Sequence, residues 1–237
     1  MKVLPSSFRA LLSKEMTAVF TSTIAYAVIA VFLLLMGYSF TATLFLSKTA
    51  SLIHIFYQAA LIMLLLIPLL TMRLFAKERR AGTLELLLTS PSREYEVVFA
   101  KFIASMAVIA AMLVLSLSYP ITLEIFGDPD WGPLYSGYLG LTLLAGALTA
   151  LGLAISALTS NQIIAAVVSM GVFFLLWMLE SLSALLPAPY DSVVTDLSLS
   201  VRITPFLTGS MYFTDFGFFL SLILFGLLAS VRALARR

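Results

Sequence analysis

Residues 77–96, KERRAGTLELLLTSPSREYE, form the one long polar passage in the first half of a very apolar sequence. Gly82 can end a helix that arrives from the left, and Leu84, Leu87 and Leu88 then fall on one face of a short amphipathic helix. Such a segment is suited to binding a partner, because its apolar face can be buried against that partner while the surrounding charges orient the contact. The pattern predicts a helix that lies across the ends of two membrane spans.

The residues that follow predict where this helix stops and the next one starts. Ser90–Pro91 ends the short helix, Ser92 can cap the next one, and Glu94 and Glu96 lie in its first turn, where the helix dipole favours anions. Composition alone leaves two interpretations open. The segment either docks into a soluble partner or is a solvated loop whose charges anchor two helix ends to lipid headgroups.

A family resemblance favours docking. The stretch AKERRAGTLELLLTSPSREYEVVFAKF resembles the first cytoplasmic loop of the permease subunits of ABC-2-type ABC transporters, especially the short gliding-motility-type branch. In that family the acidic residue, the Gly-Thr, the Glu-Leu-Leu and the Ser-Pro form a coupling helix that seats in the ATPase subunit. The resemblance implies an ATPase-coupling set made of Glu78, Arg79, Arg80, Gly82, Thr83, Leu84, Glu85, Leu87, Leu88, Ser90 and Pro91.

The motifs of common catalytic classes are missing from the sequence. It has no Gly-x4-Gly-Lys-Ser/Thr phosphate loop, no Gly-x-Ser-x-Gly and no His-Glu-x-x-His, and it contains no cysteine. The single histidine, His54, has no second ligand at metal spacing. We therefore expect no enzymatic activity, no metal and no cofactor in this chain, with ATP and magnesium held by a partner ATPase.

Composition indicates a polytopic membrane protein. Of 237 residues, 61% are hydrophobic and 11% charged, whereas a soluble domain carries roughly 25% charged residues. The net charge is +2, which gives no indication of a nucleic-acid partner. The 32 uncharged residues between Glu15 and Lys48 are far longer than a signal-peptide core, so this segment is expected to stay in the membrane.

Apolar runs of about 20 residues predict six transmembrane helices. No charge occurs from Trp131 to Leu179, which is long enough for two spans joined by a hairpin at residues 159–162. The expected spans are about 20–46, 52–75, 98–124, 135–158, 163–186 and 211–231. Pro68 is expected to kink the second span. The fold class is thus an all-α membrane protein with a single domain over residues 1–237, similar to the ABC-2 (type V exporter-like) transmembrane domain.

Two further segments complete this organisation. Residues 1–19 place an apolar stripe on one helical face, which predicts an interfacial amphipathic helix or, alternatively, a plain extension of the first span. That stripe consists of Phe8, Leu11, Leu12, Met16 and Val19. Residues 187–210 are mixed in character, and we expect an outer loop with one or two short helices that lie on the surface or dip into the membrane.

Charge distribution predicts the orientation. With six spans and a cytoplasmic N-terminus, only Lys48 and Arg202 of the 14 basic residues fall outside. The other basic residues fall on the cytoplasmic side, namely Lys2, Arg9, Lys14, Arg73, Lys77, Arg79, Arg80, Arg93, Lys101, Arg232, Arg236 and Arg237. The chain is expected in the cytoplasmic (inner) membrane with both termini in the cytoplasm.

Three smaller features have both a packing and a functional interpretation. Gly146, Ala150 and Ala154 form a small-residue ridge for helix packing, within the subunit or between two copies. The turn at residues 159–162 caps two helices or touches the partner weakly. Glu180, near the outer end of the fifth span, is either an interfacial carboxylate or a functional one.

The resemblance implies a permease subunit that couples ATP hydrolysis by a separate ATPase to export of an unidentified substrate. The implied partners are a cytoplasmic ABC ATPase, a second permease subunit (identical or related), the lipid bilayer and a periplasmic accessory protein, with no nucleic acid. By analogy, spans 1, 2 and 5 line the shared path. The alternatives are a mechanical membrane subunit of an ATPase-driven envelope machine and, disfavoured by the absent catalytic groups, an intramembrane lipid enzyme.

Overall fold

The computed structural model describes residues 5–47, 52–82, 93–126, 130–185, 187 and 190–235, and the regular structure in these ranges is helical throughout. Six of its segments are long and apolar enough to cross a membrane, which confirms the predicted fold class. They are α2 (Thr23–Ser47), α3 (Ile53–Thr71) with α4 (Ala76–Arg80), α6 (Glu94–Ser116) with α7 (Ser118–Phe126), α8 (Trp131–Leu158), α9 (Gln162–Ser183) and α12 (Phe213–Ala235).

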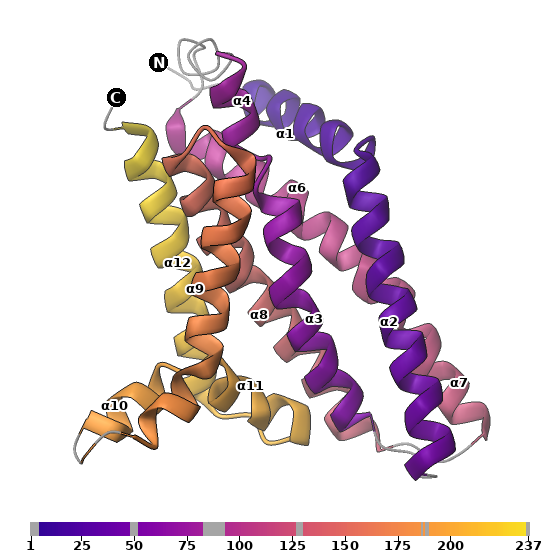
Figure 1. Ribbon diagram of the computed structural model, residues 1–237. Coiled ribbons are helices and arrows are strands. Elements are labelled where there is room, and N and C mark those ends of the chain that lie inside the picture. Colours follow the sequence, from indigo (N-terminus) through magenta and orange to yellow (C-terminus); the bar gives the residue numbers. More distant parts are fainter. Residues whose placement is uncertain are drawn as a thin grey trace.

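Helix α8 is the centre of the bundle. It contacts α3, α6, α9, α11 (Leu199–Thr208) and α12, and 78% of its most apolar window is buried, against 22% for α2 and 28% for α9 and α12. The periphery therefore leaves large apolar faces on α2, α9 and α12, as expected for surfaces covered by lipid or by another protein. Figure 1 shows α2 at one edge of the bundle, where it contacts α3 and α6.

Small residues let other elements approach the backbone of α8. A Cβ atom at Gly137 would stand 2.6 Å from the ring of Phe56 on α3, and one at Gly140 would stand 2.5 Å from the Cβ of Phe206 on α11. At these two positions glycine is needed because a side chain would collide with a neighbouring helix, and not because of the backbone conformation. Close packing of this kind replaces the hydrophobic effect as the main source of helix association in lipid.

Two of the expected spans are interrupted. Helix α3 continues past Pro68 and ends at Thr71, and a turn at residues 72–75 separates it from α4. The expected third span is two helices, because the chain breaks at Leu117 between α6 and α7. Pro120 lies in the first turn of α7, where a missing N–H costs nothing, and the Tyr119 hydroxyl donates to the carbonyl of Leu33 on α2 at 2.6 Å.

The two ends of the bundle differ in character (Figure 1). Helix α1 (Pro5–Phe20) lies across one end beside α4, and both chain termini are drawn at that end. Helices α7, α10 (Tyr190–Asp196) and α11 lie at the other. Helices α10 and α11 occupy the segment that was expected to be an outer loop with short helices, and α11 packs against α8 and α9.

The stripe expected on the first helix lies inward. Leu11 and Val19 are buried, and Phe8, Leu12 and Met16 pack against the core. Helix α1 contacts α6 and α2, so its apolar face is covered by the bundle. The turn at Thr21–Ser22 separates it from α2, so α1 and α2 are two helices. An interfacial position of α1 stays a prediction.

Candidate functional site

The polar loop begins at a structured junction between α3 and α4. The hydroxyl of Ser156, near the end of α8, accepts hydrogen bonds from the backbone N–H groups of Phe75 and Ala76, each at 3.2 Å. The same hydroxyl donates to the carbonyl of Met72 at 3.1 Å. Where the helical hydrogen-bond ladder is interrupted, a side chain from another span thus supplies the missing partners. One buried serine fixes the junction to the central helix.

Helix α4 carries a second attachment to α8. The guanidinium of Arg79 donates to the carbonyl of Ala157 at 2.8 Å, which satisfies one of the free carbonyls at the end of α8. Helix α4 ends at Arg80, and Gly82 follows with φ of +69°. A left-handed conformation after a helix favours glycine, as the sequence pattern predicted for this residue.

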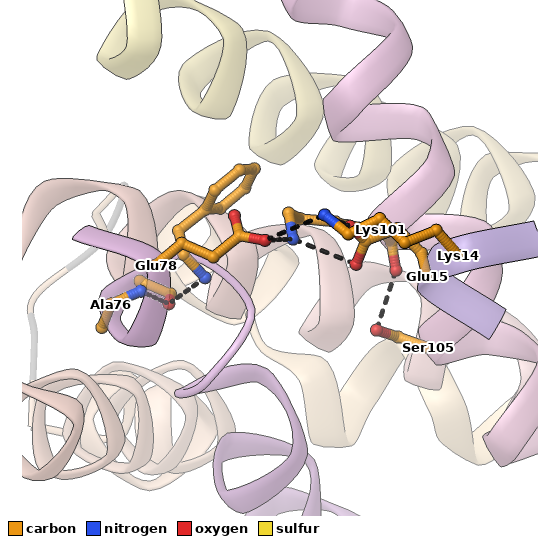
Figure 2. A network of polar contacts seen from close by, with 8 residues as sticks. Lys14, Glu15, Ala76, Glu78, Lys101 and Ser105 are labelled. Carbon is orange, nitrogen blue, oxygen red and sulfur yellow. Dashed lines mark hydrogen bonds and ion pairs between the residues drawn. The ribbon is translucent and has the colours of Figure 1, made fainter. Parts of the chain in front are cut away.

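A four-charge cluster ties α4 to two other helices (Figure 2). The amine of Lys101, on α6, lies 3.0 Å from the Glu15 carboxylate on α1 and 2.9 Å from the Glu78 carboxylate on α4. Lys14 lies 3.6 Å and 3.9 Å from the same two carboxylates. We call Lys14, Glu15, Glu78 and Lys101 the four-charge cluster; its formal charges sum to zero.

The burial of the cluster makes its geometry important. Lys101 is 2% exposed and Glu15 is 4% exposed, and the Lys101 amine also lies 5.3 Å from the centre of the Phe75 ring. A lone charge at such a position costs several kcal/mol, which two close carboxylates offset. The ion pairs of the cluster therefore form only when α1, α4 and α6 keep their relative positions. Displacement of α4 would separate opposite charges in a poorly hydrated site, or it would carry α1 and α6 along.

The far end of the polar loop is also ordered by its own residues. Helix α6 begins at Glu94, and the backbone N–H of Arg93 donates to the Glu96 carboxylate at 3.1 Å. Glu96 therefore caps the helix start from inside its first turn. The N-cap position falls at Arg93, one residue after the expected Ser92, which lies outside the described residues.

The structure covers part of the predicted coupling set. Glu78 and Arg79 turn inward, to Lys101 and to Ala157, whereas Arg80 is exposed. All three belong to the ATPase-coupling set that the family resemblance implies. The other members of the coupling set lie outside the described residues, namely Thr83, Leu84, Glu85, Leu87, Leu88, Ser90 and Pro91.

The predicted small-residue ridge lies against α12. A Cβ atom at Gly226 of α12 would stand 2.6 Å from the backbone carbon of Ala150, and one at Gly146 would stand 3.0 Å from Ile223. Ala154 is buried on the same helix. Gly146 and Ala150 thus pack within the chain, and the backbones of α8 and α12 come close where Gly226 crosses Ala150.

The opposite end of the bundle holds two smaller polar clusters. The Ser200 hydroxyl of α11 donates to the Glu180 carboxylate of α9 at 2.5 Å, so Glu180 helps to hold α11 against α9. Arg202 lies 2.9 Å from Asp215 and 3.0 Å from Asp196. These contacts fix α11 between α9 and α12. Within the described residues no group of three His, Cys, Asp or Glu side chains could hold a metal ion.

Sequence reasoning missed Lys101, Glu15 and Ser156. Lys101 had been counted only as a cytoplasmic positive charge, although it stands one turn inside an expected apolar span. An ionisable residue in that position is a signal for a buried partner. The partners themselves could not be found from spacing, because Glu15 and Glu78 come from other helices and Ser156 lies 80 residues from Ala76.

The fold and this anchored polar end define a multi-pass helical membrane protein whose spans are tied together beneath one loop. A family model described as ABC-2 family transporter protein matches residues 9–208. The chain belongs to this family, whose members are membrane permease components of ABC transporters and work with a separate ABC ATPase. Comparison with curated proteins finds no matching relative.

Proposed function

We propose that the chain is the force-receiving permease subunit of an ABC exporter, with loop 77–96 as the coupling element. The observation that carries the proposal is the anchoring of α4. Its junction is bonded to Ser156, its Arg79 to Ala157 and its Glu78 to Lys101. A push on the loop would therefore reach α1, α6 and α8 together, instead of being lost in a flexible connection.

The loop sequence supports the direction of that push. Leu84, Leu87 and Leu88 provide an apolar face for the ATPase, and Gly82 with Pro91 makes the two corners. Loop 77–96 starts at the end of the bundle that carries both termini (Figure 1), and the basic residues gathered there favour the cytoplasmic side. The resemblance of the loop supports assignment to the short gliding-motility-type branch of the family.

The export unit on this proposal contains two permease subunits, identical or related. Exposed apolar side chains on α2, such as Leu34 and Tyr38, and on α9, such as Val167 and Leu175, support a shared wall between them. ATP-driven closure of the ATPase pair would then move the loop and change the path between the two subunits. The composition of the spans does not name the cargo.

ATPase stimulation in proteoliposomes tests the proposal. The tagged chain is reconstituted with the ATPase that co-purifies with it, and Leu84→Asp and Leu88→Asp are compared with Leu185→Asp. Leu185 is 81% exposed at the opposite end of the bundle, so it is a matched control for an added carboxylate. Loss of stimulation in the loop variants alone is expected. Equal activity in all three variants would reject the loop as the coupling element.

Addition of candidate cargo separates export from a purely mechanical role. An exporter couples cargo binding to ATP turnover, so an added substrate raises ATPase activity. A mechanical subunit would retain the loop dependence and show no response to any amphipathic cargo. Both outcomes require loop 77–96 for ATPase stimulation, and only the exporter outcome requires the membrane spans to bind cargo.

A further inference from the structure

A cavity of about 600 Å³ opens beside the four-charge cluster, where α1, α2, α3, α4 and α6 come together. Its wall includes the Thr21–Ser22 turn, Arg73 just after α3, Lys77 of α4 and Lys101 of α6. The volume is in the range of small-molecule sites in proteins. The cavity stands at the level where the apolar spans give way to polar residues, which is the level of lipid headgroups in a bilayer.

The charges on this wall do not balance. Lys101 is already paired with Glu15 and Glu78, at 3.0 and 2.9 Å. Arg73 and Lys77 take part in no ion pair among the described residues, and the Nε of Arg73 is buried with no hydrogen-bond partner there. Arg73, Lys77 and Lys101 against Glu15 and Glu78 leave the cavity wall with a surplus of one positive charge, and the buried Nε of Arg73 is a donor without an acceptor among the described residues. A buried donor without a partner is destabilising, and an anion would remove that cost.

The rest of the wall fits an amphipathic anion better than a free one. Leu70 and Leu74 of the α3 end line one side, and Val19 of α1 and Ile24 of α2 line another. Helix α2 begins at Thr23 on the rim, so the positive end of its dipole adds to the field of the two cations. A phosphate would meet the basic side while a glycerol and acyl chains lay along the apolar side.

We propose that this cavity binds the phosphate headgroup of an anionic phospholipid from the leaflet in which α1 lies. Arg73 donates to the phosphate from the buried side, and Lys77 closes over it from the exposed side. The bound lipid then fills the space between α1 and the α3–α4 junction, so that it braces the same elements that the four-charge cluster ties. The inference uses the cavity alone and does not depend on the coupling role of the loop.

Lipid retention measured by native mass spectrometry tests the site. The purified chain is delipidated and offered phosphatidylglycerol or phosphatidylcholine with identical acyl chains. We expect phosphatidylglycerol to be retained in preference. Because each basic residue near an anionic lipid surface contributes about fivefold to binding, Lys77→Gln should weaken the preference about fivefold, and Arg73→Gln with Lys77→Gln by roughly 25-fold.

Arg80→Gln is the matched control, because Arg80 is an exposed residue of the same helix that does not line the cavity. It should leave the preference unchanged. Lys77 is exposed, so its single substitution keeps the test valid if the Arg73 variant fails to fold. Equal retention of the two lipids would overturn the proposal, as would an equal effect of Lys77→Gln and Arg80→Gln. Displacement of the lipid by millimolar inorganic phosphate would show a free-anion site and also overturn it.

Discussion

Replacement of Lys101 by methionine tests whether the four-charge cluster holds the loop end of the bundle together. Methionine keeps the length of the side chain and removes its charge. Glu15, which is 4% exposed, and Glu78 would then lose this amine while Lys14 stays beside both carboxylates. The lost contacts are the two short ones, at 3.0 and 2.9 Å, whereas Lys14 stands at 3.6 and 3.9 Å.

The expected loss of stability follows from these distances. Removing one partner of a buried ion pair costs about 3–5 kcal/mol, and the nearby Lys14 moves the expectation to the lower end, about 3 kcal/mol. For a chain of this length that corresponds to a fall in melting temperature of roughly 6–12 °C. Lys14→Met removes an exposed partner and should cost less than about 1 kcal/mol, which makes it the matched control.

Thermal unfolding in detergent, followed by intrinsic fluorescence, measures the effect. The triple variant Glu15→Gln, Glu78→Gln and Lys101→Met should recover most of the stability, because no buried charge is left without a partner. Its stimulation of a partner ATPase should stay low, since the tie between α4 and α6 is gone. A Lys101→Met chain that melts within about 2 °C of the unmodified one, or a triple variant that melts no higher than the single one, would refute the reasoning.

Three other substitutions separate contact from conformation. Gly226→Ala should destabilise the chain by about 1–3 kcal/mol, because a methyl group there meets the backbone of α8. Its control is Gly217→Ala, in open space on the same helix, which should be neutral or stabilising in the same melting assay. Ser156→Ala should lower the free energy of unfolding by about 1–3 kcal/mol, because it leaves two buried N–H groups unpaired. The control Ser169→Ala should have little effect, since that buried hydroxyl has no partner within the described residues. Similar melting temperatures for the two variants would contradict this expectation. Gly82→Ala should strain the end of α4 by about 1–2 kcal/mol, because of the φ of +69° at this position alone. It should reduce ATPase stimulation while membrane insertion is retained. Normal ATPase stimulation would contradict the need for glycine at position 82.

The membrane architecture could be predicted from the sequence because it depends on local properties. Runs of apolar residues fix which segments cross, and the charge-free stretch from Trp131 to Leu179 needs two helices on length alone. Gly82 was recognisable as a helix end for the same reason, since its conformational freedom is a property of the residue. The break at Leu117 was missed because no glycine stands there and the nearby Pro120 is compatible with a helix start.

The polar anchor could not be predicted because its parts are far apart in the chain. Lys101 bonds to residues 86 and 23 positions away, and only the assembled bundle brings them together. Glu78 illustrates the consequence. Its place beside the motif predicts contact with a partner, which stays a prediction, and its bond to the buried amine of Lys101 could not be read from that motif.

Cross-linking of loop 77–96 to the ATPase tests the central claim most directly. The chain has no cysteine, so a single Leu88→Cys carries a short heterobifunctional cross-linker at one defined position in membranes that hold the partner. Leu185→Cys, at the opposite end of the bundle, is the control. We predict a cross-linked product with the ATPase from Leu88→Cys and none from Leu185→Cys. A Leu88 cysteine that is labelled only from the outer side of the membrane, or that cross-links to nothing while the ATPase is bound, would contradict the account.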